Sequence, residues 1–196
     1  MYQEQAFDIP KLEGISDREI EEHLKLYAGY VKFSNTILEK IEEYKQDSEK
    51  NAYAISELQR RFSFEFNGMR NHEYYFKSLE SGAQSLPKDS ALAKTIEEEF
   101  GSFDTWLAEF SALALTRGIG WAIMYFDPIS KKLIHAWVDE HQIGQLAGLH
   151  IVLALDMWEH AFLFDYLPSE KKKYITAFFA NLNWSVIEDN YLIALG

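Results

Sequence analysis

Four side chains in this sequence have the types and spacing needed to bind a metal ion. Asp156 and His160 lie four residues apart and directly follow the apolar run 151-IVLAL. Ionisable groups beside such a run are costly to bury unless they are paired or bound to a metal. His23 and His72 lie far upstream, in segments of helical periodicity. Three imidazoles and one carboxylate form a nitrogen and oxygen ligand set suited to Fe, Mn or Zn, with room for a solvent ligand.

A simpler interpretation of the same residues stays open. Asp156 could cap a following helix, while Glu159 and His160 could form ordinary salt bridges. If the metal site exists, Glu159 becomes a candidate hydrogen-bond partner for an imidazole N–H. A di-iron carboxylate site is set aside, because it requires Glu-x-x-His pairs and the sequence contains none.

Two long helices must present the first two histidines. Apolar residues recur every three or four positions from Ile20 to about Tyr44, and again from Phe62 to Leu79. His23 and Tyr30 are seven residues apart in the first segment, which places them on the same helical face. His72 is in register with the apolar residues of the second segment. The sequence therefore predicts two helices that each direct one imidazole inward.

The second half of the chain has a different pattern. Turn residues in the segment 81–90 predict a boundary between an N-terminal helical-hairpin domain (residues 1–84) and a C-terminal α/β domain (residues 85–196). Residues 91–118 predict two short helices separated at Gly101, and residues from Glu170 onward are helical in pattern. Aromatic and β-branched runs predict three strands, at Trp121–Phe126, Leu133–Val138 and His150–Leu155. The predicted fold class is α+β, with a small three-stranded antiparallel sheet and flanking helices.

Composition limits the partners. The chain has 196 residues and a net charge of −12, which disfavours nucleic acid and anionic membranes as partners. It contains no cysteine, so disulfides and thiolate metal sites are excluded. The N-terminal stretch lacks the pattern of a signal peptide and no run reaches membrane-spanning length, so we expect a cytoplasmic protein.

The stretch 156-DMWEHAF-162 resembles the D-x-W-E-H-A-[FY] signature of the iron/manganese superoxide dismutase family. Other segments follow the family in order over nearly the whole chain: 30-YV-31, 66-FNGMRNH-72, 118-GIGW-121 and 181-NLNW-184. The resemblance implies one Fe or Mn ion per subunit, with water or hydroxide as a fifth ligand beside His23, His72, Asp156 and His160. The implied reaction is the disproportionation of superoxide to dioxygen and hydrogen peroxide, by alternate reduction and oxidation of that ion.

The resemblance also assigns roles around the metal. Tyr30 matches the family's active-site tyrosine at the substrate entrance. The residue that contacts the metal-bound solvent is usually a glutamine, and one of its two possible positions is Gly68 here, which closes that route. The other position falls at His141, which we favour, with Gln142 as the alternative because the following loop is short. The aromatic wall of the pocket would be formed by Trp121 and Trp158, which are also plausible as ordinary core residues.

The chain departs from the family pattern in two places. The first ligand and the tyrosine are separated by seven residues instead of the usual eight, which predicts a regular helix without a π-bulge. Leu26 and Leu163 stand where many members carry a His and a Tyr that pair across the dimer interface. The other cross-interface contact is kept, so we expect a homodimer in which Glu159 contacts His160 of the partner subunit.

Two alternatives to a superoxide dismutase remain at this stage. One is a relative that keeps the fold and the metal but has lost or changed the activity, and the other is a protein that uses the metal for binding or for a different redox reaction. The sequence does not choose between iron and manganese. Candidates for attracting an anionic substrate are Lys25, Arg70 and Lys171–Lys173.

Overall fold

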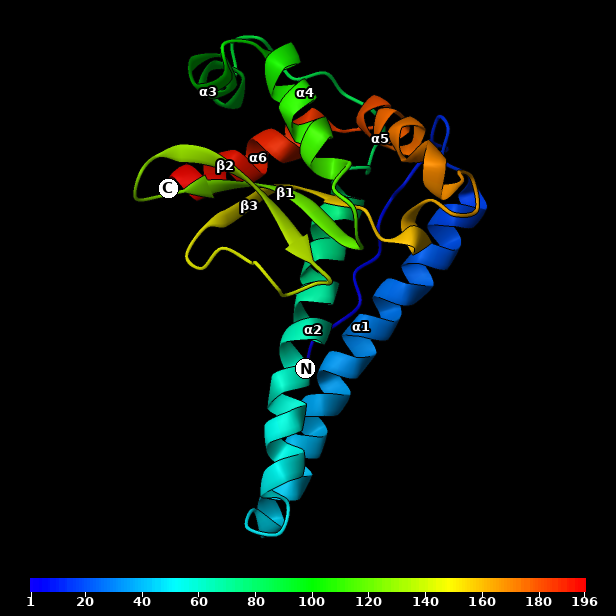
Figure 1. The fold of residues 1–196 in the computed structure, drawn as a ribbon, viewed down its shortest axis with the longest axis vertical. Coiled ribbons are helices and arrows are strands. Elements are labelled where there is room, and N and C mark those ends of the chain that lie inside the picture. Colours follow the sequence, from blue (N-terminus) through cyan, green and yellow to red (C-terminus); the bar gives the residue numbers. More distant parts are fainter.

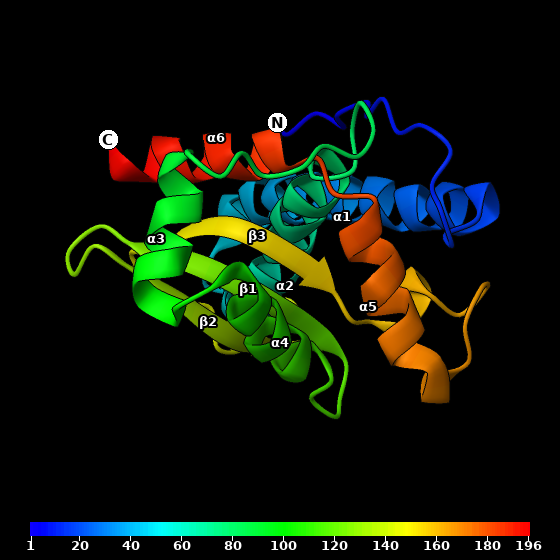
Figure 2. The ribbon, with the colours of Figure 1, turned by 90° about the horizontal axis from the view of Figure 1, so that it is seen from above.

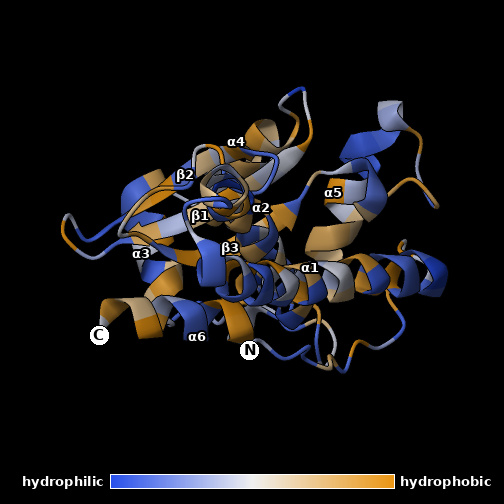
Figure 3. Cartoon of the chain, turned by 90° about the horizontal axis from the view of Figure 1, so that it is seen from below, coloured by the Kyte–Doolittle hydropathy of each residue, from blue (hydrophilic) through white to orange (hydrophobic).

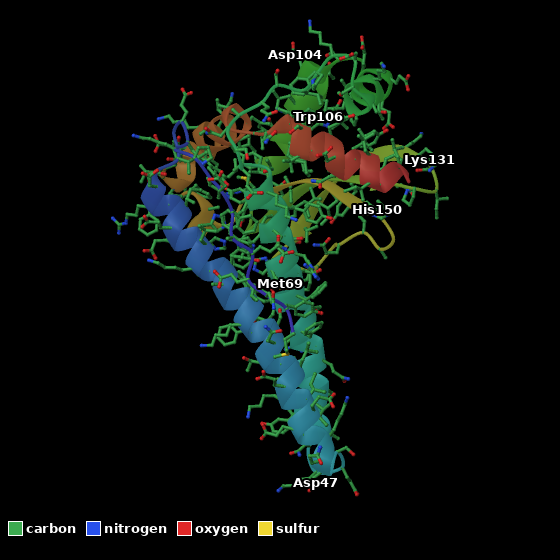
Figure 4. The ribbon with its side chains drawn as sticks, turned by 180° about the vertical axis from the view of Figure 1, so that it is seen from behind. Asp47, Met69, Asp104, Trp106, Lys131 and His150 are labelled. Carbon is green, nitrogen blue, oxygen red and sulfur yellow. The ribbon has the colours of Figure 1, made fainter.

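A pair of long antiparallel helices forms the first half of the protein. The computed structural model describes all residues 1–196, and it contains α1 (Asp17–Tyr44) and α2 (Ala52–Lys77), joined through a 3₁₀ turn at Lys45–Asp47. The hairpin projects from the rest of the molecule (Figure 1), and Asp47 lies at its tip (Figure 4). Hydrophilic and hydrophobic residues alternate along α1, as an amphipathic helix requires (Figure 3).

The ends of these helices test the sequence prediction. The Ser16 side chain accepts a hydrogen bond from the backbone N–H of Glu19, which caps α1. The helix is regular between His23 and Tyr30, as predicted. In contrast, α2 begins at Ala52, well before the predicted start at Phe62. Its buried residues begin only at Glu65, but Ile55, Leu58 and Phe62 already recur at helical spacing, so the apolar pattern extends further toward the N-terminus than the prediction took it.

The second half builds a small antiparallel sheet. The strands are β1 (Gly120–Asp127), β2 (Lys132–Asp139) and β3 (His150–Asp156), in the order β2-β1-β3. Each predicted strand is confirmed to within about a residue at either end. Gly120 starts the central strand at a point of close approach, where an added Cβ would lie 2.1 Å from the carbonyl oxygen of Val138. In the register, Trp121 pairs with Asp156 on one side and with Val138 on the other.

Helices cover this sheet. The helices α3 (Ala91–Phe100) and α4 (Phe103–Ala114) are separated at Gly101, as predicted, and α4 packs over β1 and β2. On the opposite face α2 packs against β3, and α6 (Trp184–Leu195) lies along the same strand (Figure 2). The helical sequence predicted from Glu170 onward forms two helices, because the chain leaves α5 (Lys171–Ala180) and Asn183 then caps α6 by accepting from the N–H of Ser185.

One apolar core joins the two halves. It includes Tyr27 and Met69 from the hairpin together with Trp106 and Phe126 from the α/β part, all buried. Met69 and Trp106 mark its two sides in Figure 4. None of the helices combines the length and the apolar character needed to span a bilayer. The packing of α2 against β3 matters most for function, because it brings residues of the hairpin to the end of the sheet.

Candidate metal centre

Four side chains meet where the helical hairpin touches the end of the sheet. One ligand atom from each of His23, His72, Asp156 and His160 lies within 4.8 Å of all the others. The Oδ2 atom of Asp156 is 3.1 Å from Nε2 of His23, 3.5 Å from Nε2 of His72 and 3.2 Å from Nε2 of His160. The set predicted from the sequence is therefore brought together around one carboxylate oxygen.

Each residue reaches this point from a different element. His23 comes from α1, His72 from α2, Asp156 from the last position of β3, and His160 from the 3₁₀ turn Glu159–Ala161. The turn begins at once because the backbone N–H of Trp158 donates to Oδ1 of Asp156, at 2.8 Å. That hydrogen bond leaves Oδ2 facing the three imidazoles. Asp156 thus orients the turn as well as supplying a ligand atom, but it does not cap the 3₁₀ helix, whose N-cap is Trp158 without a side-chain cap hydrogen bond.

Burial and charge favour the metal-binding protonation states. Asp156 is fully buried, which alone would raise its pKa, but His160 and His23 together hold that pKa well below its usual range. Burial lowers the pKa of His23 and lowers that of His72 far below 6.5. The site therefore holds a carboxylate together with neutral imidazoles at His23 and His72, which are the forms that coordinate a metal.

The tautomer of His72 also favours metal binding. Nδ1 of His72 lies 2.6 Å from the carbonyl oxygen of Gly68, which can only accept, so the ring proton sits on Nδ1 and Nε2 is left as a lone-pair donor. That Nε2 atom is buried and has no hydrogen-bond partner. A buried nitrogen aimed at three other ligand atoms is costly unless a cation binds it. The donor set fits a single Fe or Mn ion.

A second group of residues lies beside the ligands. The hydroxyl oxygen of Tyr30 is 2.8 Å from Nε2 of His141, and Nε1 of Trp121 donates to Nδ1 of His141 at 3.0 Å. His141 is completely buried, and burial lowers its pKa to about 4. The Tyr30 ring also lies 5.0 Å from the ring of His72. The pair Tyr30–His141, predicted from the family pattern, is thus formed next to the ligands.

Gly68 supports the site in two ways, through its lack of a side chain and through its backbone carbonyl. A Cβ added at this position would lie 2.7 Å from the Cδ1 atom of Tyr30. The tyrosine ring therefore packs directly on the backbone of α2, and only glycine leaves it that space. The same residue supplies the carbonyl oxygen that fixes the tautomer of His72. Its absent side chain and its backbone both serve the site.

Two tryptophans line the same region. The ring of Trp158 stacks on His141 at 4.8 Å and on His160 at 5.6 Å between centroids. Trp121 lies 5.0 Å from the ring of His72, because its register position in β1 is opposite Asp156. Both residues are core aromatics and neighbours of the site at once.

Other predicted residues lie outside the cluster. The side-chain oxygen of Gln142 accepts from the backbone N–H of His141, at 3.3 Å, and no hydrogen bond joins Gln142 to Tyr30. Glu159 is exposed. Among the candidate substrate-attracting cations, Lys25 pairs with Glu22 and Arg70 pairs with Glu73.

Sequence reasoning missed two residues that hold His141. Gln145 donates to the carbonyl oxygen of His141 at 3.1 Å and to Oδ1 of Asn71 at 3.2 Å, and its own oxygen accepts from Tyr125. Phe64 places its ring 4.6 Å from that of His141. The polar residues of the loop after β2 were a signal for Gln145, but Phe64 looked like one more apolar residue of a helix.

Comparisons with known proteins agree with this geometry. Residues 87–190 match the family model "Iron/manganese superoxide dismutases, C-terminal domain". The chain is 36% identical over 185 residues to a superoxide dismutase [Fe] of Aquifex aeolicus, covering 92% of this chain and 85% of that protein. It is 34% identical over 188 residues to a superoxide dismutase [Mn] of Nocardia asteroides, covering 94% and 89%. A superoxide dismutase [Mn] of Mycobacterium leprae is 34% identical, with coverage of 96% and 90%. The chain therefore belongs to the iron/manganese superoxide dismutase family.

Proposed function

We infer that the chain catalyses the dismutation of superoxide with one Fe or Mn ion held by His23, His72, Asp156 and His160. The observation that carries this conclusion is the convergence of three imidazole nitrogens on Oδ2 of Asp156, in a chain that belongs to a family of superoxide dismutases. A bound Fe or Mn ion would supply the one-electron redox chemistry that the reaction needs. The relatives include both iron and manganese proteins, so either metal is consistent with them.

The protein must also manage protons, because two superoxide anions and two protons give dioxygen and hydrogen peroxide. We assign this task to Tyr30 and His141. Trp121 donates to Nδ1 of His141, and the imidazole is neutral, so its single proton lies on Nε2 and points to the oxygen of Tyr30. Tyr30 accepts that hydrogen bond and keeps its own proton, because burial raises its pKa. The Tyr30 hydroxyl is then free to donate a proton to a reacting oxygen.

A homodimer is the second part of the proposal. Leu26, Leu163 and Phe164 are large apolar side chains that are exposed in the single chain. Leu163 and Phe164 directly follow the turn that carries Glu159 and His160, and the side chain of His160 is 20% exposed. Apolar residues beside an exposed carboxylate and the edge of an imidazole support an interface through Glu159 and His160. The apolar pair Leu26 and Leu163 would replace a polar contact at its rim.

We also propose that the chain divides after residue 84. The helical hairpin then supplies His23 and His72, and the α/β part supplies Asp156 and His160. In this division neither part holds more than half of the ligand set, so the site depends on the packing of α2 against β3. A metal bound across that junction would also hold the two parts together.

Reconstitution with each metal separately tests the proposed activity. We expect the iron form, the manganese form or both to dismutate superoxide at about one metal per chain. His72→Ala and Asp156→Ala should lose both the metal and the activity while circular dichroism reports a folded chain. Stoichiometric metal without dismutation would overturn the activity and favour a relative with a changed function. Full activity in the folded ligand variants would overturn the site itself.

A further inference from the structure

An arginine lies beside the Tyr30–His141 pair on the outward side of α2. The guanidinium carbon of Arg61 sits 3.7 Å above the centre of the Phe64 ring, one turn later in the same helix. The side chain of Arg61 is 50% exposed. The stack therefore fixes a cation at the surface while leaving part of it open to solvent.

Phe64 connects this cation to the site. Its ring meets that of His141 edge-on, with centroids 4.6 Å apart, and lies 6.1 Å from Tyr30 and 6.4 Å from Trp158. Phe64 is half-buried, so it separates the exposed guanidinium from the buried imidazole. One ring thus stands between Arg61 and the residues to which we assign proton delivery.

The orientation of Arg61 is fixed by Glu65. Nε of Arg61 donates to Oε1 of Glu65 at 2.8 Å, and one terminal nitrogen lies 2.7 Å from the same oxygen. Glu65 is nearly buried, at 8% exposure, so the exposed part of the pair is the cation. A guanidinium has five N–H donors, and this arrangement engages two of them. The remaining donors are available to an approaching anion.

The charge of Arg61 also reaches the site. Burial is the main reason that the pKa of Tyr30 is raised and that of His141 is lowered, and the Arg61 guanidinium lowers both. Arg70 is also paired with a nearly buried carboxylate, that of Glu73, but it packs over the rings of Tyr2 and Phe66 instead of the ring that meets His141. Arg61 is therefore the better placed of the two arginines to act on an anion near Tyr30.

We propose that Arg61, stacked on Phe64, attracts the superoxide anion to the entrance beside Tyr30. This inference rests on the proposed function, since it concerns the substrate of that site. The need for such a residue follows from the charge of the molecule, because a net charge of −12 repels an anionic substrate at long range. A local cation held at the entrance offsets that repulsion where the substrate must pass. Arg61 acts on the encounter and takes no part in the chemical step.

The test compares Arg61→Gln with Arg60→Gln in the metal-loaded protein. Arg60 is the preceding residue of the same helix, 72% exposed and paired with Glu57, so the control removes the same charge from a side chain that is not stacked on Phe64. We measure kcat/KM for superoxide at ionic strengths from about 10 to 200 mM. Arg61→Gln should lower kcat/KM about three- to tenfold at the lowest ionic strength and converge with the wild type at the highest. Arg60→Gln should stay within about twofold of the wild type, and Arg61→Lys should recover most of the rate.

Binding of azide provides a readout that does not depend on turnover. Azide is a small monovalent anion, and its affinity is followed by the change in the visible absorption of the metal-loaded protein. We expect Arg61→Gln to weaken azide binding about threefold at low ionic strength, with Arg60→Gln unchanged. This measurement still tests Arg61 if the wild type fails to dismutate superoxide, so the two failures are distinguishable.

Two results would overturn the proposal. One is an equal effect of the Arg60 and Arg61 variants on both kcat/KM and azide affinity. The other is a loss of rate in Arg61→Gln that persists unchanged at high ionic strength, together with a lower melting temperature, because that pattern reports a structural role for the stack on Phe64.

Discussion

Nε2 of His141 lies 2.8 Å from the hydroxyl oxygen of Tyr30, although the two residues are 111 positions apart in the chain. Tyr30 comes from the middle of α1 and is partly buried, and His141 comes from the loop after β2 and is fully buried. Trp121 donates a hydrogen bond to Nδ1 of His141, so the ring proton lies on Nε2 and His141 is the donor to Tyr30. A neutral imidazole has one proton, and His141 uses it in the hydrogen bond to Tyr30. The proton left for the substrate is therefore that of the Tyr30 hydroxyl.

Tyr30→Phe is therefore expected to reduce turnover while leaving the metal in place. The variant removes the hydroxyl and leaves the ring that packs on Gly68 and lies near His72. Loss of a positioned proton donor should lower kcat by about tenfold or more. The measurement is kcat from pulse radiolysis together with metal content by elemental analysis. Unchanged kcat at full metal content would show that protons reach the substrate by another path.

Gly68→Ala should have a similar effect through sterics alone. The new methyl group would lie 2.7 Å from the Tyr30 ring, so the ring or the helix must move. We expect a loss of stability of about 1–3 kcal/mol and a clear drop in kcat. Gly29→Ala is the matched control, because it makes the same change in α1 where the added Cβ meets no atom within 4 Å apart from the adjoining residues and backbone of its own helix. That control should raise stability by up to about 1 kcal/mol and leave kcat alone. Equal behaviour of the two variants in thermal melts would contradict the packing argument.

The parts of this molecule that follow from local sequence were predictable, and those that follow from tertiary contact were not. His23 and His72 were found because each sits in a periodic apolar pattern, and Asp156 because it ends an apolar strand. The start of α2 is an exception, because Ile55 and Leu58 continue the helical spacing back from Phe62 and were not included in the predicted pattern. The break between α5 and α6 was missed because it depends on one capping side chain, that of Asn183.

The supports of the site illustrate the same limit. Gln145 reaches the carbonyl of His141 only because the loop after β2 folds back beside Asn71 of α2. Nothing in the spacing of these residues predicts that contact. Arg61 and Phe64 likewise carry no pattern that singles them out in the sequence, and their relation to His141 appears only when α2 packs beside the sheet. Contacts between side chains on different helices, strands and loops are the information that a single sequence does not provide.

Leu163→Glu tests the proposed dimer. Leu163 is 46% exposed and follows the turn that holds His160, so a carboxylate there would face its own copy or Glu159 across an interface. We expect the variant to shift from dimer to monomer, with a weakening of association of at least about tenfold. Light scattering coupled to size exclusion measures the mass directly. The matched control is Leu167→Glu, which places the same charge on a residue that is 65% exposed beyond the turn. If the wild type is monomeric at micromolar concentration, the proposed homodimer is wrong.

His135 provides a pH-dependent element of stability away from the metal. Its ring stacks on Phe100 and meets Phe110 edge-on, and its Nε2 atom is buried without a partner. Burial lowers its pKa from 6.5 to about 4. Between these two values the unfolded chain binds a proton that the folded chain does not, so the free energy of unfolding should rise with pH across that range. The stability that depends on the neutral His135 ring is lost progressively as the pH falls from about 6.5 toward 4.

His135→Phe should remove that dependence, because phenylalanine does not titrate and suits the aromatic surroundings. Relative to the wild type, the variant should be more stable at pH 5 than at pH 8 by about 1–2 kcal/mol. Any change that does not depend on pH cancels in this difference, so a generally weakened variant still gives a valid result. The measurement is chemical unfolding at both pH values with the metal content held equal. His150→Gln, an exposed histidine at the start of β3, should leave the difference unchanged. If both variants retain the pH dependence of the wild type, the buried ring of His135 is not its source.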